Sequence, residues 1–149
     1  MTHARRFTIR VRVYYEDTDA GGIVYHATYL RWMERVRTEW LRALGASHGA
    51  LAERDGLQFV VSALDIRYRR PARLDDLLDV DLEVTEVRRA SLRVAQRTRL
   101  AADSDVPATA EGLLADAGVR IAVMDRRSGR PAPLPEWLID RLAPRLESR

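Results

Sequence analysis

The sequence predicts an α+β fold in which one long helix packs against an antiparallel sheet. Between Tyr25 and Leu44 the chain has neither glycine nor proline, and its apolar residues recur mostly at helical spacing. Much of the remaining chain alternates between apolar and polar residues, as half-buried strands do. Because short turns join the later strands, these strands should pair in antiparallel fashion.

The strands are expected on both sides of the long helix. Before it, the odd-numbered residues from Phe7 to Tyr15 are apolar or aromatic and should face the core. After it, alternation predicts four more strands, at residues 57–70, 78–87, 91–100 and 113–124. A polar loop around Pro107 should separate the last two.

The helices are expected to supply much of the core. A helix of twenty residues is about 30 Å long, enough to cross a small sheet. Its stripe of Trp32, Met33, Val36 and Trp40 is interpreted as core packing and not as a cofactor pocket. Gly45 should end this helix. Shorter helices are expected at residues 46–55 and 135–146.

The length of the chain fits one domain. Its 149 residues and 17.0 kDa predict a single domain over residues 1–149, with a core at about 7–125 and a C-terminal extension at 126–149. One helix cannot cover every apolar surface of such a sheet. We therefore expect part of that surface to pack against another subunit.

The composition excludes several kinds of chemistry. The chain has no cysteine, so disulfides, thiolate metal sites and cysteine nucleophiles are ruled out. Its 25 basic residues are all arginine, which rules out a Schiff-base lysine and a P-loop lysine. The motifs G-x-S-x-G and G-x-G-x-x-G are also absent, which argues against serine-hydrolase and dinucleotide-binding sites.

The charge pattern and hydropathy predict a cytoplasmic protein. The net charge of +3 is small, and most arginines lie near acidic residues, so no nucleic-acid partner is expected. No apolar run approaches the roughly 20 residues that cross a bilayer, so no integral membrane association is expected. Residues 1–12 lack the apolar stretch of a secretory signal.

The most informative segment joins the first strand to the long helix. Asp17 and Asp19 follow the strand, Gly21 and Gly22 come next, and His26 stands at the expected helix start. A carboxylate can act as general base or nucleophile, and helix-start N–H groups can stabilise an oxyanion. Acyl transfer or hydrolysis uses both parts. From the residues alone, however, an acidic turn that caps the helix is the commoner explanation.

The same side chains could serve other chemistry. Asp17, Asp19 and His26 could bind a metal, or the aspartates could serve phosphoryl transfer. The chain has only three histidines and lacks the βαβ alternation of such phosphoryl-transfer sites, so no metal is expected. His26 could equally orient a reactant or cap the helix.

Two arginine clusters have the side chains that phosphate binding uses. They lie at residues 67–73 and at Arg88-Arg89. Solvated charge on an edge strand is the commoner explanation for such clusters.

Residues 13–30, VYYEDTDAGGIVYHATYL, closely resemble the signature of the hotdog-fold acyl-CoA thioesterases. The segment is most similar to the YbgC branch, the Tol–Pal-associated enzymes related to 4-hydroxybenzoyl-CoA thioesterase. The resemblance continues through residues 31–34 and, more weakly, to about Met124.

The resemblance implies a fold, an activity and a site. It implies a five-stranded antiparallel sheet wrapped around the long helix, in homodimers or homotetramers, and hydrolysis of an acyl-CoA without a separate cofactor. Asp19 would be the catalytic carboxylate, and the N–H at His26 would polarise the thioester carbonyl. Arg88 and Arg89 match the basic turn that meets the CoA phosphates in the relative, although Ala90 replaces its lysine.

Three hypotheses follow. The first is an acyl-CoA thioesterase. The second is a hotdog protein that acts on acyl carrier protein, or that binds acyl groups without hydrolysing them. The third is a metal-dependent phosphohydrolase that uses Asp17 and Asp19. The sequence leaves the acyl group, the choice between dimer and tetramer, and any Tol–Pal link open.

Overall fold

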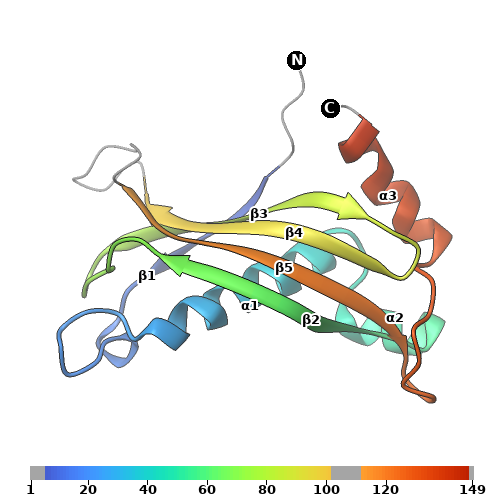
Figure 1. The fold of residues 1–149 in the computed structure, drawn as a ribbon, viewed down its shortest axis with the longest axis horizontal. Coiled ribbons are helices and arrows are strands. Elements are labelled where there is room, and N and C mark those ends of the chain that lie inside the picture. Colours follow the sequence, from blue (N-terminus) through green and yellow to red (C-terminus); the bar gives the residue numbers. More distant parts are fainter. Residues whose placement is uncertain (1–5, 102–111, 148–149) are drawn as a thin grey trace.

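The computed structural model describes residues 6–101 and 112–147. Five strands form one sheet in the order β1-β3-β4-β5-β2, with every neighbouring pair antiparallel. The long helix lies against one face of this sheet (Figure 1). The main elements in chain order are β1 (Phe7–Arg12), α1 (His26–Ala43), α2 (His48–Asp55), β2 (Leu57–Tyr68), β3 (Leu77–Val87), β4 (Ser91–Leu100), β5 (Leu113–Asp125) and α3 (Glu136–Glu147). The architecture is the predicted hotdog arrangement.

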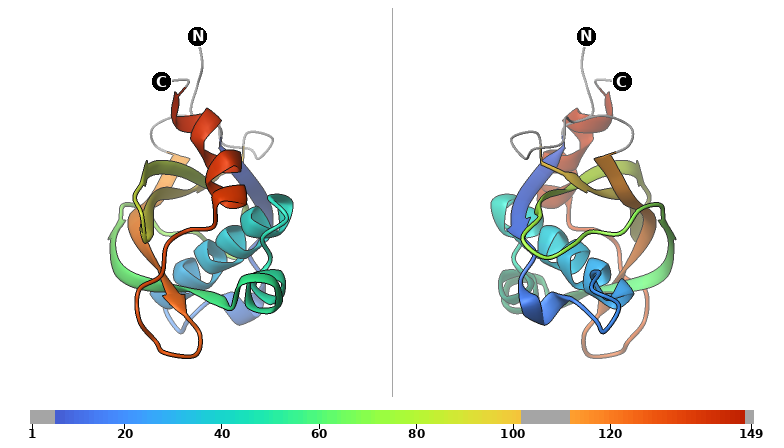
Figure 2. Two further views of the ribbon diagram at one scale, coloured as in Figure 1. Left: turned by 90° about the vertical axis from the view of Figure 1, so that its right-hand side faces the viewer. Right: turned by 90° about the vertical axis from the view of Figure 1, so that its left-hand side faces the viewer.

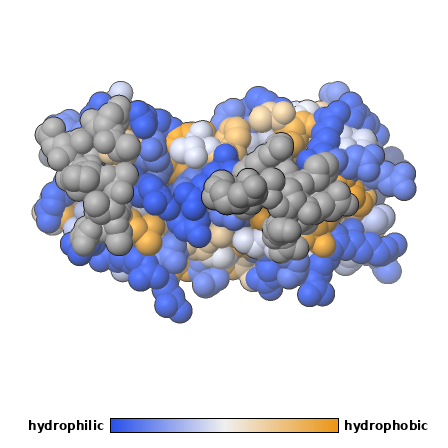
Figure 3. Space-filling view, turned by 90° about the horizontal axis from the view of Figure 1, so that it is seen from above, coloured by the Kyte–Doolittle hydropathy of each residue, from blue (hydrophilic) through white to orange (hydrophobic). Residues whose placement is uncertain are grey.

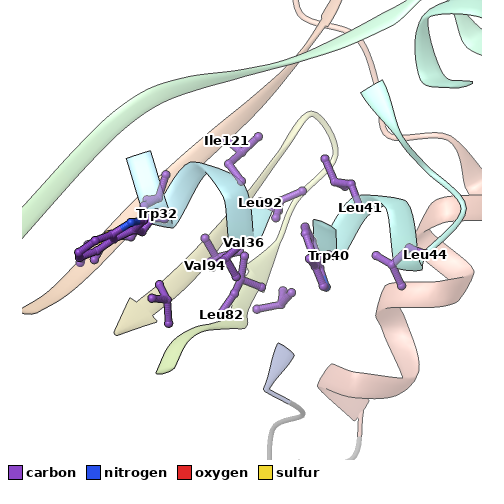
Figure 4. Packing of buried hydrophobic residues seen from close by; sticks show 14 of the residues in the cluster. Trp32, Val36, Trp40, Leu41, Leu44, Leu82, Leu92, Val94 and Ile121 are labelled. Atoms are coloured by element: carbon purple, nitrogen blue, oxygen red, sulfur yellow. The ribbon is translucent and has the colours of Figure 1, made fainter. Parts of the chain in front are cut away.

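Helix α1 supplies the centre of the core. Trp32, Met33, Val36 and Trp40 are all at most 2% exposed, which confirms the interpretation of this stripe as core. Figure 4 shows Val36 and Trp40 close to strand residues such as Leu92. Burying large aromatic and aliphatic side chains of this kind stabilises a fold by roughly 1.5–3 kcal/mol each.

The strands follow the predicted two-residue period. Leu78, Val80, Leu82 and Val84 of β3 are buried, and so are Val119, Ile121 and Val123 of β5. The residues between them point to the outer face of the sheet, where Arg10 of β1 pairs with Asp79 at 2.9 Å. Viewed from that side, hydrophilic side chains are spread between apolar areas (Figure 3). This arrangement agrees with the prediction of interspersed surface charge.

The two shorter helices also form as predicted. Gly56 adopts a positive φ of 66° and ends α2. Leu138 and Leu142 of α3 are fully buried in the common core, so the C-terminal helix packs on the rest of the molecule (Figure 2). The predicted loop around Pro107 falls largely on residues 102–111, which lie outside the described residues.

The first strand is shorter than expected. It ends at Arg12, and Tyr15, which alternation places in the core, is 82% exposed. The reason is local: the Asp17 carboxylate accepts a hydrogen bond from the Tyr14 N–H at 2.8 Å and draws the chain into a 3₁₀ turn at Tyr15–Asp17. Such side-chain bonds to nearby backbone groups compete with strand formation.

Strand β2 lies at the edge of the sheet and is poorly covered. It pairs with β5, whereas α1 packs chiefly on β3 and β1. The register places Val61 opposite Ile121 and Leu64 opposite Val119, on the face that carries the core. Even so, Val61 is 41% exposed and Leu64 is 37% exposed. One helix therefore leaves this part of the apolar face open, as the sequence predicted.

Candidate active site

The loop between β1 and α1 is held in shape by Asp17. Besides the bond from Tyr14, its backbone carbonyl accepts a hydrogen bond from the Tyr25 N–H at 2.9 Å. One residue thus fixes the start of the loop and its return to the helix. This is the role of a turn residue, and it occupies the Asp17 carboxylate.

Asp19 occupies the tip of this loop. Its Oδ1 accepts a hydrogen bond from the Gly21 N–H at 2.8 Å, and its carbonyl accepts one from the Gly22 N–H at 3.0 Å. Gly22 needs its positive φ of 80°, and a Cβ on Gly21 would lie only 3.2 Å from Asp19 Oδ1. The two glycines therefore let the backbone wrap around the carboxylate. Within the described residues, Oδ2 accepts no hydrogen bond.

The start of α1 offers free N–H groups. The side chain of the N-cap residue Tyr25 accepts no hydrogen bond from the helix. The backbone carbonyl of Tyr25 accepts one from the Thr28 N–H at 2.9 Å. His26 and Ala27 are the first two helical residues, whose N–H groups have no partner inside a helix. They also lie at the positive end of the helix dipole. This end of α1 can therefore hold an oxyanion.

A pocket of about 260 Å³ opens beside this helix start. Its lining includes His26, the aromatic rings of Tyr29 and Tyr68, and apolar side chains from the loops on either side. Asp19 does not line the pocket itself. Its N–H donates to the carbonyl of Ile23, which does line it, at 2.9 Å. The structure thus places His26 in the pocket wall, and it places Asp19 in the preceding loop, joined to the pocket residue Ile23 by a backbone hydrogen bond.

Arg88 and Arg89 lie far from this pocket in the same chain. They form the turn between β3 and β4, where the Arg88 N–H donates to the Ser91 carbonyl at 2.8 Å. β3 begins beside the loop between β1 and α1, residues 13–25, which we call the site loop. It runs for 11 residues, or about 35 Å, before it reaches this turn. A single chain therefore does not bring these arginines to Asp19.

The pocket instead carries Arg69 and Arg70, from the cluster that the sequence analysis attributed to edge-strand charge. Arg69 makes a two-pronged pair with Asp116, at 2.7 and 3.4 Å, and this pair lowers the pKa of the Asp116 carboxyl. Arg70 lines the same pocket. The sequence analysis named this cluster as one suited to phosphate but gave it no place, and it missed Tyr68, because tertiary structure decides that the end of β2 lies beside the start of α1.

A second cavity of about 260 Å³ lies further along α1, against β2. Its polar lining is a short chain of hydrogen bonds: the Thr38 hydroxyl donates to Glu34 at 2.6 Å and lies 3.3 Å from His48 Nε2. Arg37 also lines it, and burial lowers the pKa of this guanidinium. Eight residues separate Glu34 from His26, about 12 Å along the helix.

Across residues 6–101 and 112–147, no three His, Cys, Asp or Glu side chains gather as metal ligands would. The sheet is antiparallel, whereas phosphoryl transfer by paired aspartates uses the ends of parallel strands. In the same part of the chain, no helix is both long and apolar enough for a membrane crossing.

Comparison with known proteins gives one consistent family. The family model described as "Thioesterase-like superfamily" matches residues 2–142. The chain is 44% identical over 130 residues to the acyl-CoA thioesterase YbgC of Haemophilus influenzae, covering 87% of this chain and 89% of that protein. It is also 44% identical to the acyl-CoA thioester hydrolase YbgC of Escherichia coli O6:H1, covering 87% and 90%.

A solved structure agrees in fold. The 1,4-dihydroxy-2-naphthoyl-CoA thioesterase from Synechocystis superposes with a TM-score of 0.80 at 22% identity, covering 93% of this chain and 96% of that one. The 44% identical relatives confirm the resemblance to the YbgC branch, and the solved structure confirms the fold that it implied. The chain belongs to the thioesterase-like superfamily and has its hotdog fold.

Proposed function

We propose that this protein hydrolyses acyl-CoA thioesters to a free acid and CoA, with Asp19 and the start of α1 as the reacting groups. One observation carries the proposal: a carboxylate with a free oxygen occupies the loop that leads directly into an uncapped helix start. Acyl-CoA thioesterase activity in the YbgC relatives supports the choice of substrate.

In the proposed hydrolysis, the helix start and the Asp19 carboxylate have different roles. The thioester carbonyl oxygen would accept hydrogen bonds from the N–H groups of His26 and Ala27, which stabilise the negative charge that develops on it. Asp19 Oδ2 would take a proton from the attacking water, or attack the carbonyl carbon itself and form a mixed anhydride that water then opens. The C–S bond breaks and CoA leaves as a thiolate, which needs no strong acid.

The active unit is proposed to be a homodimer or a homotetramer. The open apolar face of β2, together with its unpaired outer edge, is suited to a second copy of the chain. In one chain Arg88 and Arg89 lie too far from the pocket to contact a substrate there, but the same residues of a second subunit could reach it. We retain them as contacts to the CoA phosphates, now supplied by another subunit. A cytoplasmic location and the absence of a separate cofactor complete this proposal.

The test is release of CoA thiol from a panel of acyl-CoAs. We expect Asp19→Asn to lower the rate at least about 10²-fold, because removal of one member of a catalytic unit has at least this effect. The amide oxygen of Asn can still accept the Gly21 N–H, so the loop should keep its shape. Glu16→Gln is the matched control, since it makes the same change of charge in the same loop.

Three outcomes would count against the proposal. An Asp19→Asn variant as fast as the wild type would make Asp19 a turn residue only. A wild type that hydrolyses no acyl-CoA would favour action on acyl carrier protein, or acyl-group binding alone, which an acyl carrier protein thioester would then separate. Activity that a chelator abolishes and magnesium restores would favour the phosphohydrolase hypothesis.

A further inference from the structure

Tyr68 connects the edge strand to the start of the long helix. It is the last residue of β2, and its hydroxyl donates a hydrogen bond to the backbone carbonyl of His26 at 2.9 Å. The two residues are 42 positions apart in the chain. His26 is the first residue of α1, so this bond fixes the first turn of the helix to the sheet.

The first turn lacks the usual restraint at this position. Most helices have a side chain at the N-cap that accepts a hydrogen bond from one of the first N–H groups, which contributes about 1 kcal/mol. Here Tyr25 makes no such bond. A side-chain cap would occupy an N–H group that the proposed reaction needs, whereas an uncapped turn is free to fray.

Tyr68 restrains the turn by another route. A carbonyl oxygen has two lone pairs, so the His26 carbonyl can accept the hydroxyl of Tyr68 as well as the helical N–H of Leu30. The contact therefore anchors the turn through an acceptor and leaves the N–H groups of His26 and Ala27 free. Burial raises the pKa of Tyr68, so the hydroxyl remains a donor at neutral pH.

The surrounding rings hold Tyr68 in place. Its ring centroid lies 5.4 Å from that of Tyr29 and 6.2 Å from that of His26, and both pairs are T-shaped. The Tyr29 hydroxyl in turn accepts the Ala72 N–H at 2.9 Å, and the Ala72 carbonyl accepts the Val24 N–H at 2.9 Å. These contacts therefore connect Tyr68 to His26 at the helix start and, through Tyr29 and Ala72, to Val24 in the preceding loop.

We propose that Tyr68 is a positioning residue for the reaction, whose hydroxyl fixes the first turn of α1 so that its free N–H groups face the thioester oxygen. This inference rests on the proposed thioesterase function. Tyr68 itself does not touch the reacting atoms through this bond. It acts through the His26 carbonyl.

The test is Tyr68→Phe, which keeps the ring contacts and removes only the hydroxyl. We expect kcat for acyl-CoA hydrolysis to fall about tenfold, a part of the roughly 10²–10³-fold loss when an oxyanion donor is removed outright. KM and the melting temperature should stay unchanged, because the pocket and the core keep their contacts. Tyr14→Phe, at a tyrosine that is 64% exposed, is the matched control.

A second readout does not depend on activity. Amide hydrogen exchange at Leu30, whose N–H bonds the same carbonyl within the helix, should become faster in Tyr68→Phe and not in Tyr14→Phe. An unchanged kcat with unchanged Leu30 exchange would overturn the inference. So would a loss of rate matched by an equal loss of stability.

The two proposals can fail separately. If Asp19→Asn abolishes hydrolysis while Tyr68→Phe is fully active and exchanges normally, only the role of Tyr68 is wrong. If Asp19→Asn is also fully active, the proposed site itself is wrong.

Discussion

At the scale of single residues, the site depends on how closely the backbone can approach one carboxylate. Asp19 receives an N–H from Gly21 and shares a tight turn with Gly22. These bonds orient one carboxylate oxygen, while the other accepts no hydrogen bond from the residues that the structure describes. The close approach uses Gly21, where a Cβ would lie 3.2 Å from Asp19 Oδ1, and the turn uses Gly22 with its φ of 80°.

Gly22→Ala tests this turn. A side chain at a φ of 80° is strained by about 1–2 kcal/mol, so we expect the free energy of unfolding to fall by that amount and thiol release to fall with it. Chemical denaturation and the thiol assay measure the two effects.

Gly49→Ala is the matched control for that variant. Gly49 lies in α2, and a Cβ there would meet nothing within 4 Å. Since alanine favours helices over glycine, this variant should be at least as stable as the wild type. If Gly22→Ala were as stable as Gly49→Ala, the turn would not require a glycine.

At the scale of elements, a buried polar residue joins the long helix to the sheet. Gln96 of β4 is fully buried; its Oε1 accepts from Arg37 at 2.9 Å and its Nε2 donates to the Met33 carbonyl at 3.0 Å. Gln96 thus puts a polar side chain on the buried face of β4. The alternation of a strand predicts an apolar residue at this position. It does not predict hydrogen bonds to Arg37 and Met33 of α1.

Gln96→Leu should therefore be costly. It leaves the Arg37 guanidinium without this acceptor in a partly buried site, and we expect a loss of about 2–3 kcal/mol in the free energy of unfolding. Gln58→Leu, at the exposed start of β2, should change stability by less than about 0.5 kcal/mol. Urea denaturation of both variants makes the comparison, and equal midpoints would show that the Gln96 bonds add nothing.

At the scale of the whole molecule, the decisive feature is the apolar face that α1 does not cover. Val61, Leu64 and Tyr68 are each more than a third exposed, although they lie on the side of the sheet that carries the core. The candidate pocket opens along the same strand. Assembly and activity should therefore depend on one surface.

Leu64→Arg tests this dependence. A charge placed in an apolar interface between copies would have to be desolvated, so we expect a monomer in place of the wild-type oligomer, together with reduced thiol release. Light scattering gives the mass. Leu74→Arg, at a loop residue that is 43% exposed, is the control and should keep the wild-type mass. A wild type that is already monomeric would contradict the proposed assembly.

The sequence by itself determined the elements and the location of the site loop. Helical spacing predicted α1, alternation predicted the strands, and the acid–glycine–glycine segment placed a carboxylate before a helix start. These are local patterns, and each is set by residues near one another in the chain. The largest misplacement of a strand end, that of β1, arose because the Asp17 side chain competes with the strand for backbone hydrogen bonds.

Only the tertiary structure decided which distant residues meet. It brought Tyr68 to the His26 carbonyl and Arg69 and Arg70 to the pocket, and it placed Arg88 and Arg89 at the opposite end of the sheet. The physical reason is that strand order and the path of α1 follow from burying apolar area as a whole. No spacing along the chain records that order, so contacts between segments appear only once the sheet is assembled.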